Sequence, residues 1–341
     1  MRVLVYGQPW REGMPASVAA AFRKLGHEVC LFDFTRHLYY ARIGSRWAHA
    51  LDKTLSFEVA WRINKKLRQT LTERRYDLVL ICTWRHVWAE TLAVAGHRST
   101  WVACWTFDEP FNPTYVNSHT ADAFRQYAVV FTPRGHLIPE YVERGARRVE
   151  RLPFCFDPEI HYPVTLSGPD QALWGGDAVF VGTWSRKREE LLSALKDFKV
   201  RVWGHSWRHA RRGFKANASI LVGGRAVAGL DMSRALNGAS IALNFFTPEQ
   251  RDMTNVRNFE IPACGAFQLC ERTPEVRELL DEGKEVACFE SPEEMIEIVR
   301  YYLPRPEERR AMAAAAYRRI LHDGHTYLDR VPTMVKCLER A

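Results

Sequence analysis

The sequence predicts an α/β protein made of two doubly wound, parallel-sheet domains. Three observations predict it: the chain has 341 residues, short apolar strands alternate with amphipathic helices, and Pro and Gly interrupt this pattern near the middle. At roughly 150 residues per domain, this length favours two domains. Strands alternating with helices form parallel sheets, because each right-handed crossover returns the chain to the same edge of the sheet.

The first half begins with a strand, a loop and a helix. Residues 3–6 form an apolar run ending at Gly7, and Pro15 and Gly26 bound a helix expected over 15–25. Further strands are expected at 28–34, 77–82, 100–105, 128–132 and 149–154, with helices at 87–95 and 136–144. Apolar residues at every fourth position also predict a long amphipathic helix or helix pair, through Trp47, Leu51, Leu55, Val59, Ile63, Leu67 and Leu71.

The second half repeats this rhythm after a break. Pro and Gly cluster between residues 156 and 176, so we expect a first domain at 1–160, a linker at 161–176 and a second domain at 177–325. Strands are expected at 178–182, 200–204, 240–246, 266–270 and 286–289. Helices are expected at 188–195, 225–237, 256–264, 275–281, 292–302, 306–321 and 326–339.

Composition narrows the class of protein. Hydrophobic residues make up 47% of the chain, which excludes wholesale disorder, and the net charge of +8 is compatible with an anionic partner without naming one. No apolar stretch is long enough for a membrane span, and the N-terminus does not resemble a signal peptide. The eight cysteines contain no C-x-x-C pair, so we expect a cytoplasmic protein without a zinc site.

Open α/β sheets bind ligands at the carboxyl ends of their strands, so the loops after strands are the candidate sites. The first such loop begins at Gly7 and contains neither G-x-G-x-x-G nor a Walker A sequence. It could bring backbone close to a ligand, or it could be a simple turn.

The loop at 182–188 combines glycine, a hydroxyl and cations at the start of a helix. Gly182, Thr183, Arg186 and Arg188 could bind a diphosphate, because a helix N-terminus and guanidinium groups both attract phosphate oxygens. The alternative is a solvated basic turn.

Two further loops carry polar side chains. Asn255, Arg257 and Glu260 open a helix and could hydrogen-bond sugar hydroxyls or phosphate, or form only a cap and a surface ion pair. Asp108 ends an apolar strand, where a carboxylate could act as a general base or as a cap. His86, after the preceding expected strand, is another candidate base, although a single histidine is more often structural.

The sequence does not favour several other functional classes. The sequence contains no G-x-S-x-G elbow and no H-E-x-x-H zinc motif. The basic run 208–212 lies near Trp203 and Trp207, which permits nucleic-acid contact, but a solvated loop explains it better.

The run Arg257–Ala266 resembles the R-x-F-E-x-x-A-C-G-A signature of the spore maturation protein B-like glycosyltransferases, a spore-coat-type group of the group-1 glycosyltransferases. Phe180–Trp184 followed by Arg188, and the segments 285–286, 306–309 and 325–330, also resemble that family. The resemblance covers about residues 178–335, whereas residues 1–155 match only in layout.

This resemblance implies a GT-B fold, in which two Rossmann-like domains face each other across a cleft and the second holds a nucleotide-sugar donor without a required metal. It implies that Glu260 binds donor hydroxyls and that Arg188 and Arg257 face the diphosphate. Related enzymes often carry a second Glu eight residues later that touches the ribose, and Gln268 stands at that position here. The final helix, about 326–341, would join the first domain.

The sequence thus predicts a cytoplasmic glycosyltransferase that needs no cofactor. Its donor would be a nucleotide-diphospho-sugar, most simply a UDP-sugar, and its acceptor a small molecule, a glycan or a protein. Arg186, Arg188 and Arg257 would stabilise the leaving diphosphate, and Asp108 would serve as base if the reaction inverts the anomeric carbon. The alternatives are a nucleotide-sugar epimerase or hydrolase, an inactive binding or structural protein, and a nucleic-acid glycosyltransferase.

Overall fold

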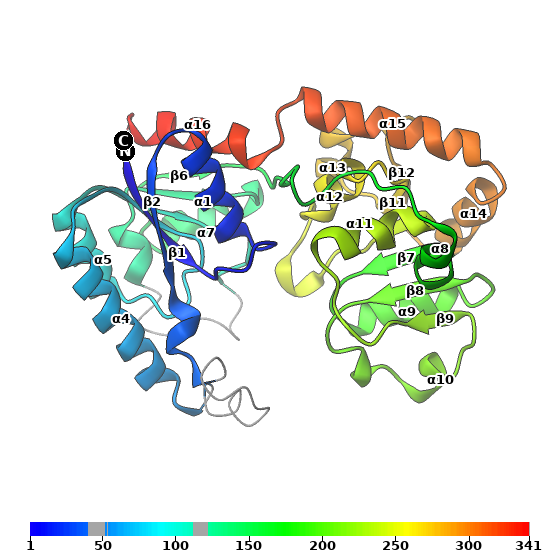
Figure 1. Cartoon of the computed structure of the whole chain (residues 1–341), viewed down its shortest axis with the longest axis horizontal. Coiled ribbons are helices and arrows are strands. Elements are labelled where there is room, and N and C mark those ends of the chain that lie inside the picture. The colour runs from blue at the N-terminus through cyan, green and yellow to red at the C-terminus, as the bar shows by residue number, and fades with distance from the viewer. Residues whose placement is uncertain (40–51, 53, 112–121, 341) are drawn as a thin grey trace. The chain divides into compact units, whose positions relative to one another are not determined.

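The computed structural model describes residues 1–39, 52, 54–111 and 122–340, and it forms two units (Figure 1). The first unit is Met1–Pro153 with Tyr327–Ala341, and the second is Phe154–Thr326. Each unit holds a six-stranded parallel sheet with helices on both faces. This arrangement confirms the predicted fold class of two doubly wound, Rossmann-like domains.

The sheet of the first unit has the strand order β2-β1-β3-β4-β5-β6. Its strands are β1 (Arg2–Gly7), β2 (Glu28–Asp33), β3 (Tyr76–Ile81), β4 (Ser99–Trp105), β5 (Val129–Thr132) and β6 (Val149–Arg151). The interior strand β1 is apolar and buried from Val3 to Tyr6 because helices cover both faces of the sheet. The order reverses beside β1, so the topological switch point lies between β1 and β3.

Helices on the two faces of this sheet come from distant parts of the chain. One face is covered by α1 (Met14–Lys24) and α16 (Tyr327–Leu338), and the other by α4 (Ser56–Glu73), α5 (Ala89–Arg98) and α7 (Ile138–Glu143). Short 3-10 helices lie at Phe34–His37, Asp122–Gln126 and Gly135–Leu137. The expected apolar stripe buries Val59, Ile63, Leu67 and Leu71 on α4. Trp47 and Leu51 of the same stripe lie outside the described residues.

The sheet of the second unit has the order β12-β11-β10-β7-β8-β9. Its strands are β7 (Gly176–Val181), β8 (Val200–Trp203), β9 (Ile220–Val222), β10 (Ala239–Asn244), β11 (Gln268–Glu271) and β12 (Ala287–Phe289). The chain builds outward from β7 to β9 and then returns to the other side of β7. The switch point of this sheet therefore lies between β7 and β10.

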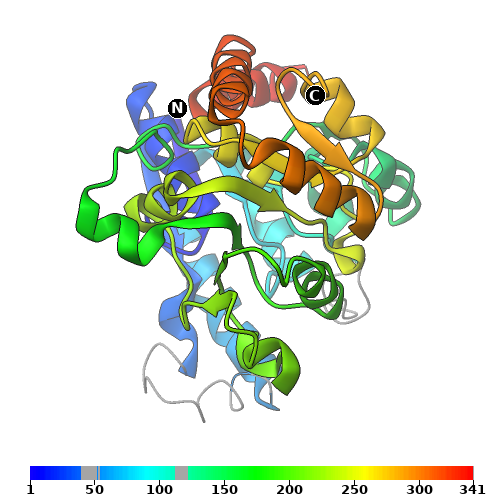
Figure 2. The ribbon, with the colours of Figure 1, turned by 90° about the vertical axis from the view of Figure 1, so that its right-hand side faces the viewer.

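Two hydrophobic clusters fix the helices of the second unit on its sheet (Figure 1, Figure 2). On one face lie α9 (Arg186–Ala194), α10 (Arg212–Lys215) and α14 (Pro292–Tyr302); on the other lie α8 (Gly168–Trp174), α11 (Gly229–Gly238) and α12 (Arg257–Ala263). The remaining helices are α13 (Pro274–Leu279) and α15 (Pro306–His322), and α15 packs on α12. Across the described residues, no helix has the length and apolar character needed to cross a membrane.

The segment 161–176, expected as a linker, lies within the second unit. Its helix α8 buries Trp174 against Trp203, with ring centroids 4.8 Å apart, and His161 is also buried. Of the Pro and Gly residues that suggested a linker, Gly168 and Pro169 open α8, and Gly175 and Gly176 lead into β7. Composition could not distinguish a linker from a packed segment because the packing partners are remote in sequence.

Candidate functional site

The switch point of the second sheet brings two of the predicted loops together. Arg188 spans them: its guanidinium donates to the carbonyl oxygen of Thr183 at 2.9 Å and to that of Phe245 at 3.0 Å. Thr183 follows β7 and Phe245 follows β10, so one cation is tied to the carboxyl ends of both strands. This is the edge where open α/β sheets bind ligands.

Three consecutive cations at the start of α9, Arg186, Lys187 and Arg188, make different contacts. Ser185 caps the helix by accepting a hydrogen bond from the Arg188 amide at 3.3 Å, which fixes the helix start at the strand ends. Lys187 pairs with Glu271 at 2.5 Å. Arg186 is 60% exposed and lies 3.9 Å from Glu190. The structure therefore brings Arg188 to the edge of the sheet and leaves Arg186 on the helix surface.

A buried carboxylate connects the third loop to the former linker segment. Glu260 pairs through one oxygen with Arg257, and its other oxygen lies 3.3 Å from Nε2 of His161. The Arg257 Nε also donates to the carbonyl oxygen of Val181 at 3.2 Å, at the end of β7. Arg257 is thereby held at the same strand end as Gly182.

These contacts set the charges of the cluster. Burial would raise the pKa of Glu260, but the positive charge of Arg257, the charge of His161 and the hydrogen bond from Arg257 together hold the pKa below its usual value. Burial also lowers the pKa of His161, an effect that Glu260 partly opposes. At neutral pH the cluster is therefore an ionised carboxylate, a guanidinium and a neutral imidazole.

Asn255 orders the loop before α12 through its side chain. Its Oδ1 accepts from Asn244 Nδ2 at 3.1 Å and from the Arg257 amide at 2.9 Å, and its Nδ2 donates to Asn244 Oδ1 at 2.9 Å. The Asn255 amide in turn donates to Asn258 at 2.9 Å. Asn255 thus aims Arg257 toward β7, and these contacts occupy most of its amide side chain.

Gln268 does not join this group. It begins β11 at the end opposite to the carboxyl edge, and it is 2% exposed. The spacing of eight residues from Glu260 crosses the turn at Gly265 and enters the next strand, so the side chain points into the unit. The structure gives Gln268 no access to a ligand at the carboxyl edge.

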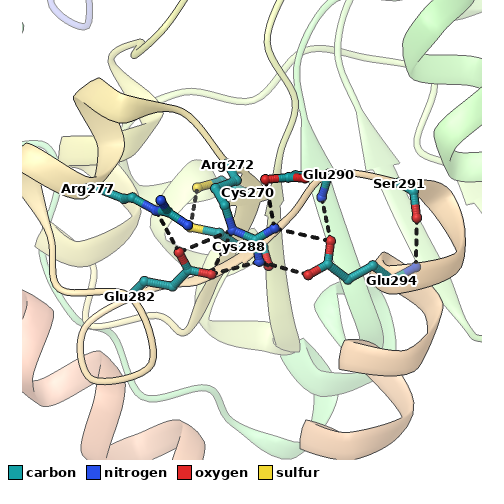
Figure 3. A network of polar contacts seen from close by, with 8 residues as sticks. All are labelled: Cys270, Arg272, Arg277, Glu282, Cys288, Glu290, Ser291 and Glu294. Carbon is teal, nitrogen blue, oxygen red and sulfur yellow. Dashed lines mark hydrogen bonds and ion pairs between the residues drawn. The ribbon is translucent and has the colours of Figure 1, made fainter.

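The rest of this edge is fixed by a third guanidinium, that of Arg272. Figure 3 shows Arg272, directly after β11, bonded to Glu282 at 2.9 Å, to Glu294 at 2.7 Å and to the carbonyl oxygen of Cys288 at 3.0 Å. The hydrogen bonds that Arg272 donates to these carboxylates, chiefly to Glu282, raise its pKa. The cation is therefore permanent and joins the loops after β11 and β12 to α14.

A cavity of about 960 Å³ lies beside β8 and β9. Trp207 lines it and donates from Nε1 to the Gly182 carbonyl at 2.9 Å. Gly204 also lines it with φ +151, and a Cβ there would lie 1.8 Å from the same carbonyl oxygen, so glycine is required. The charged and aromatic lining includes Arg201, Trp203, Trp207, Arg208, Lys215 and Arg225.

The remaining predicted residues, Gly7 and Asp108, belong to the first unit. A Cβ at Gly7 would lie 2.3 Å from Pro15 Cγ, so close packing of α1 explains this glycine. Asp108 is 51% exposed and lies 3.5 Å from Arg85. Gly7 ends β1 and Asp108 follows β4, so both lie at the carboxyl edge of the first sheet and not among the residues of the second.

Sequence reasoning missed His161 and the cavity beside β8. His161 was placed in a linker, and only its packing against Glu260 shows its part in the cluster. The cavity depends on Gly204 and on indole rings whose orientation no local pattern encodes. Within the described ranges, no group of three or more His, Cys, Asp or Glu side chains could hold a metal ion.

Known proteins resemble part of this chain in sequence and the whole chain in fold. Residues 186–336 match the family described as glycosyl transferase-like, whereas no curated protein matches the chain. Sucrose-phosphate synthase from Thermosynechococcus elongatus has a similar structure, with 10% identity, a TM-score of 0.72, and coverage of 100% of this chain and 98% of that one. HepE from Anabaena, solved with UDP and glucose, shares 13% identity with a TM-score of 0.69 and full coverage of both chains.

Trehalose-6-phosphate synthase is similar too, with 10% identity, a TM-score of 0.68, and coverage of 100% of this chain and 99% of that one. These structures confirm the GT-B fold. The match of residues 186–336 to the glycosyl transferase-like family agrees with the predicted enzyme class. The narrower resemblance to spore maturation protein B-like enzymes stays a prediction.

Proposed function

We propose that this protein transfers a sugar from a nucleotide-diphospho-sugar to a hydroxyl group of a small molecule, a glycan or a protein. The observation that carries the proposal is the pair of guanidinium groups at the switch point of the second sheet. Arg257 is tied to the carbonyl of Val181, and Arg188 to those of Thr183 and Phe245. Two cations are thus fixed where a bound anion would meet both.

Such an arrangement suits a diphosphate leaving group. Negative charge grows on the diphosphate as its bond to the sugar breaks, and cations already held in place stabilise that charge without reorganisation. The N-terminus of α9 adds a partial positive charge. We propose that these groups fulfil the role that a metal ion plays in other transferases.

The cavity beside β8 and β9 suits the nucleoside. Its volume of about 960 Å³ lies within the range for small-molecule sites, and Trp203 and Trp207 supply aromatic surface. UDP is the favoured nucleotide, since the similar protein HepE was solved with UDP. Glu260 would accept a hydrogen bond from a donor hydroxyl, because each carboxylate oxygen has a second lone pair beyond its present partner.

The proposal is tested by ligand-induced thermal stabilisation with UDP, GDP, dTDP, ADP, CMP and their sugar conjugates, with and without EDTA. A ligand that binds the native state raises the unfolding midpoint. One diphosphate nucleotide should stabilise the wild-type protein in EDTA. Arg188→Ala and Arg257→Ala should each weaken its binding by about 10- to 100-fold, since each removes a charge-assisted hydrogen bond.

Arg310→Ala is the matched control, because Arg310 is an exposed cation of the same unit that forms an ion pair with Glu307. It should bind the nucleotide like wild type. Absence of any shift at millimolar ligand would contradict the proposal. Consumption of the donor without any acceptor would instead indicate the epimerase or hydrolase alternative.

A further inference from the structure

The helix α4 carries an exposed face that the proposed reaction does not use. Its buried side packs on the first sheet through residues such as Val59 and Ile63. On the opposite side, Phe57 is 61% exposed and Trp61 is 43% exposed. Residues four apart are neighbours on a helix surface, so these two rings form one patch. Single exposed apolar side chains are ordinary, whereas an exposed patch of large ones indicates an interaction surface.

The aromatic patch continues onto the neighbouring helix. α4 and α5 lie side by side on the first unit (Figure 1). The ring of Trp88, which directly precedes α5, lies 5.3 Å from the ring of Phe57. Trp88 is half-buried, and its amide donates to Oδ1 of the buried Asn64 at 3.0 Å, which anchors it to α4. The patch therefore spans both helices and rests on a fixed scaffold.

Cations border this patch. The Nζ of Lys65 lies 5.0 Å from the centroid of the Trp61 ring, one turn further along α4. Arg68 follows, and its guanidinium donates to Thr91 Oγ1 of α5 at 2.9 Å. Spaced by three or four residues, Phe57, Trp61, Lys65 and Arg68 share one side of the helix, the outer face of α4.

Positive charge is concentrated along this helix. Residues 56–75 contain six lysines and arginines and two glutamates, so half of the chain's net charge of +8 lies in this short segment. One of the glutamates, Glu58, is paired with Arg62, whereas Lys65 and Lys66 are exposed. A partner that fits the outer face of α4 therefore offers negative charge and apolar material side by side.

The headgroup region of an anionic bilayer offers both. Aromatic side chains settle at the boundary between headgroups and acyl chains, and anionic lipids attract the Lys and Arg side chains beside them. Single-stranded nucleic acid also combines charge with stacking surfaces, but the proteins that bind it place their aromatic rings within a positively charged groove. The outer face of α4 is the convex surface of a helix, which suits a deformable lipid layer better than a polymer that must be enclosed.

We propose that the outer face of α4 docks the protein on an anionic membrane surface. Phe57 and Trp61 enter the headgroup region, and Lys65 lies at the level of the lipid phosphates. The buried side of α4 stays packed on the first sheet, so the helix lies on the membrane without crossing it. Docking weakens with salt, because ions screen the attraction between cations and lipids. All of these residues belong to the first unit, and the inference does not rest on the proposed function.

Sedimentation of the full chain with lipid vesicles tests this docking. Vesicles of phosphatidylcholine with about one third phosphatidylglycerol should bind the protein at about 0.05 M salt, and about 0.5 M salt should weaken binding by about 10-fold or more. Vesicles of phosphatidylcholine alone should bind it at least about 10-fold more weakly. Equal binding to the two kinds of vesicle would contradict the proposal.

Two matched double variants locate the surface. Trp61→Ser with Lys65→Glu removes an exposed ring and reverses the charge of the cation beside it, so affinity for the anionic vesicles should fall about 10- to 100-fold. Tyr301→Ser with Arg305→Glu makes the same change in net charge on α14 of the second unit. There Tyr301 is 48% exposed and the Arg305 guanidinium lies 3.9 Å from its ring centroid. This control should bind the vesicles like wild type.

Both double variants change side chains at the surface, so their unfolding midpoints should stay within about 3 °C of wild type. If Trp61→Ser with Lys65→Glu lowers the midpoint further, Phe57→Ser replaces it and should weaken vesicle binding about 3- to 10-fold. Equal vesicle binding by the variant and its control, whether retained or lost, would overturn the proposal. So would a wild-type protein that ignores the vesicles and instead binds a single-stranded oligonucleotide through the same face.

The outcome is separable from that of the proposed function, because sedimentation involves no sugar nucleotide. A protein that binds a nucleotide in the thermal screen but no vesicle would refute only the docking surface. A protein that docks on vesicles through α4 but binds no nucleotide would refute only the proposed function.

Discussion

The carboxyl edges of the two sheets share a topology but differ in chemistry. Both sheets are parallel, and both reverse their strand order beside the first strand of their unit. In the second unit this edge carries Arg188 and Arg257, tied to backbone carbonyls. In the first unit it carries His86 with φ +68, a strained conformation held by the hydrogen bond from Asn64 to its carbonyl oxygen. Each sheet therefore has a switch point at its carboxyl edge, and the residues of the loops there determine the chemistry of that edge.

Different interactions therefore determine the stability of the two edges. The second holds charge that must stay paired, because an isolated buried ion is costly. The first holds backbone strain, which is released when the hydrogen bonds that impose it are removed. Changes that break one edge should leave the other intact, and the following predictions use this difference in order of decreasing effect.

The largest effect is expected from Arg257→Ala. It leaves the carboxylate of Glu260 buried without its cation, so the free energy of unfolding of the second unit should fall by about 3–5 kcal/mol. Urea unfolding at pH 7 measures it. The double variant Arg257→Met with Glu260→Gln removes both charges and should recover most of the loss. Equal destabilisation of the single and double variants would show that the charge pair is not the cause.

A smaller effect is expected from Asn64→Ala in the first unit. The change removes two hydrogen bonds to the loop after β3, one to the His86 carbonyl and one from the Trp88 amide. It leaves buried backbone groups unpaired, so stability should fall by about 2 kcal/mol. The Trp88 amide should also exchange hydrogen faster. Thr70→Ala on the same helix is the control, and it should change stability by less than about 0.5 kcal/mol. Unaltered exchange at Trp88 would mean that Asn64 does not hold the loop.

The smallest effect concerns acid stability. Because Arg257 and His161 hold the pKa of Glu260 below its usual value in the folded state, the unfolded state binds this proton more tightly. The resulting stability is present above the unfolded pKa of about 4.5 and is lost as the pH falls through the folded pKa. Glu260→Gln should therefore show a shallower decline in stability below pH 4.5 by urea unfolding. Identical slopes in the two proteins would refute the shift.

Much of the fold could be predicted because its signals are local. The apolar run of β1, the Pro15 start of α1 and the glycine after it indicate a strand and a helix with no knowledge of the rest of the chain. By contrast, β9 has three residues and α10 has four, too few for any periodicity. The segment 161–176 was misassigned because its Pro and Gly content says nothing of the partner of Trp174.

The candidate site shows the same limit. The positions of Arg188 and Arg257 followed from the rule that ligands bind after strands, combined with the residue types in those loops. Gln268 was misplaced because spacing along the chain does not reveal which end of a strand a residue occupies. His161 was missed because its partner, Glu260, is 99 residues away in the sequence.

The sequence by itself determined the alternation of strands and helices, the parallel sheets and the loops that contain cations, since periodicity and residue type act over a few neighbours. Only the tertiary structure decided that Arg188 joins β7 to β10, that Glu260 is shared by Arg257 and His161, and that Asn64 strains His86. These contacts join residues from separate elements. Their geometry is set by packing across the whole unit, which no local pattern specifies.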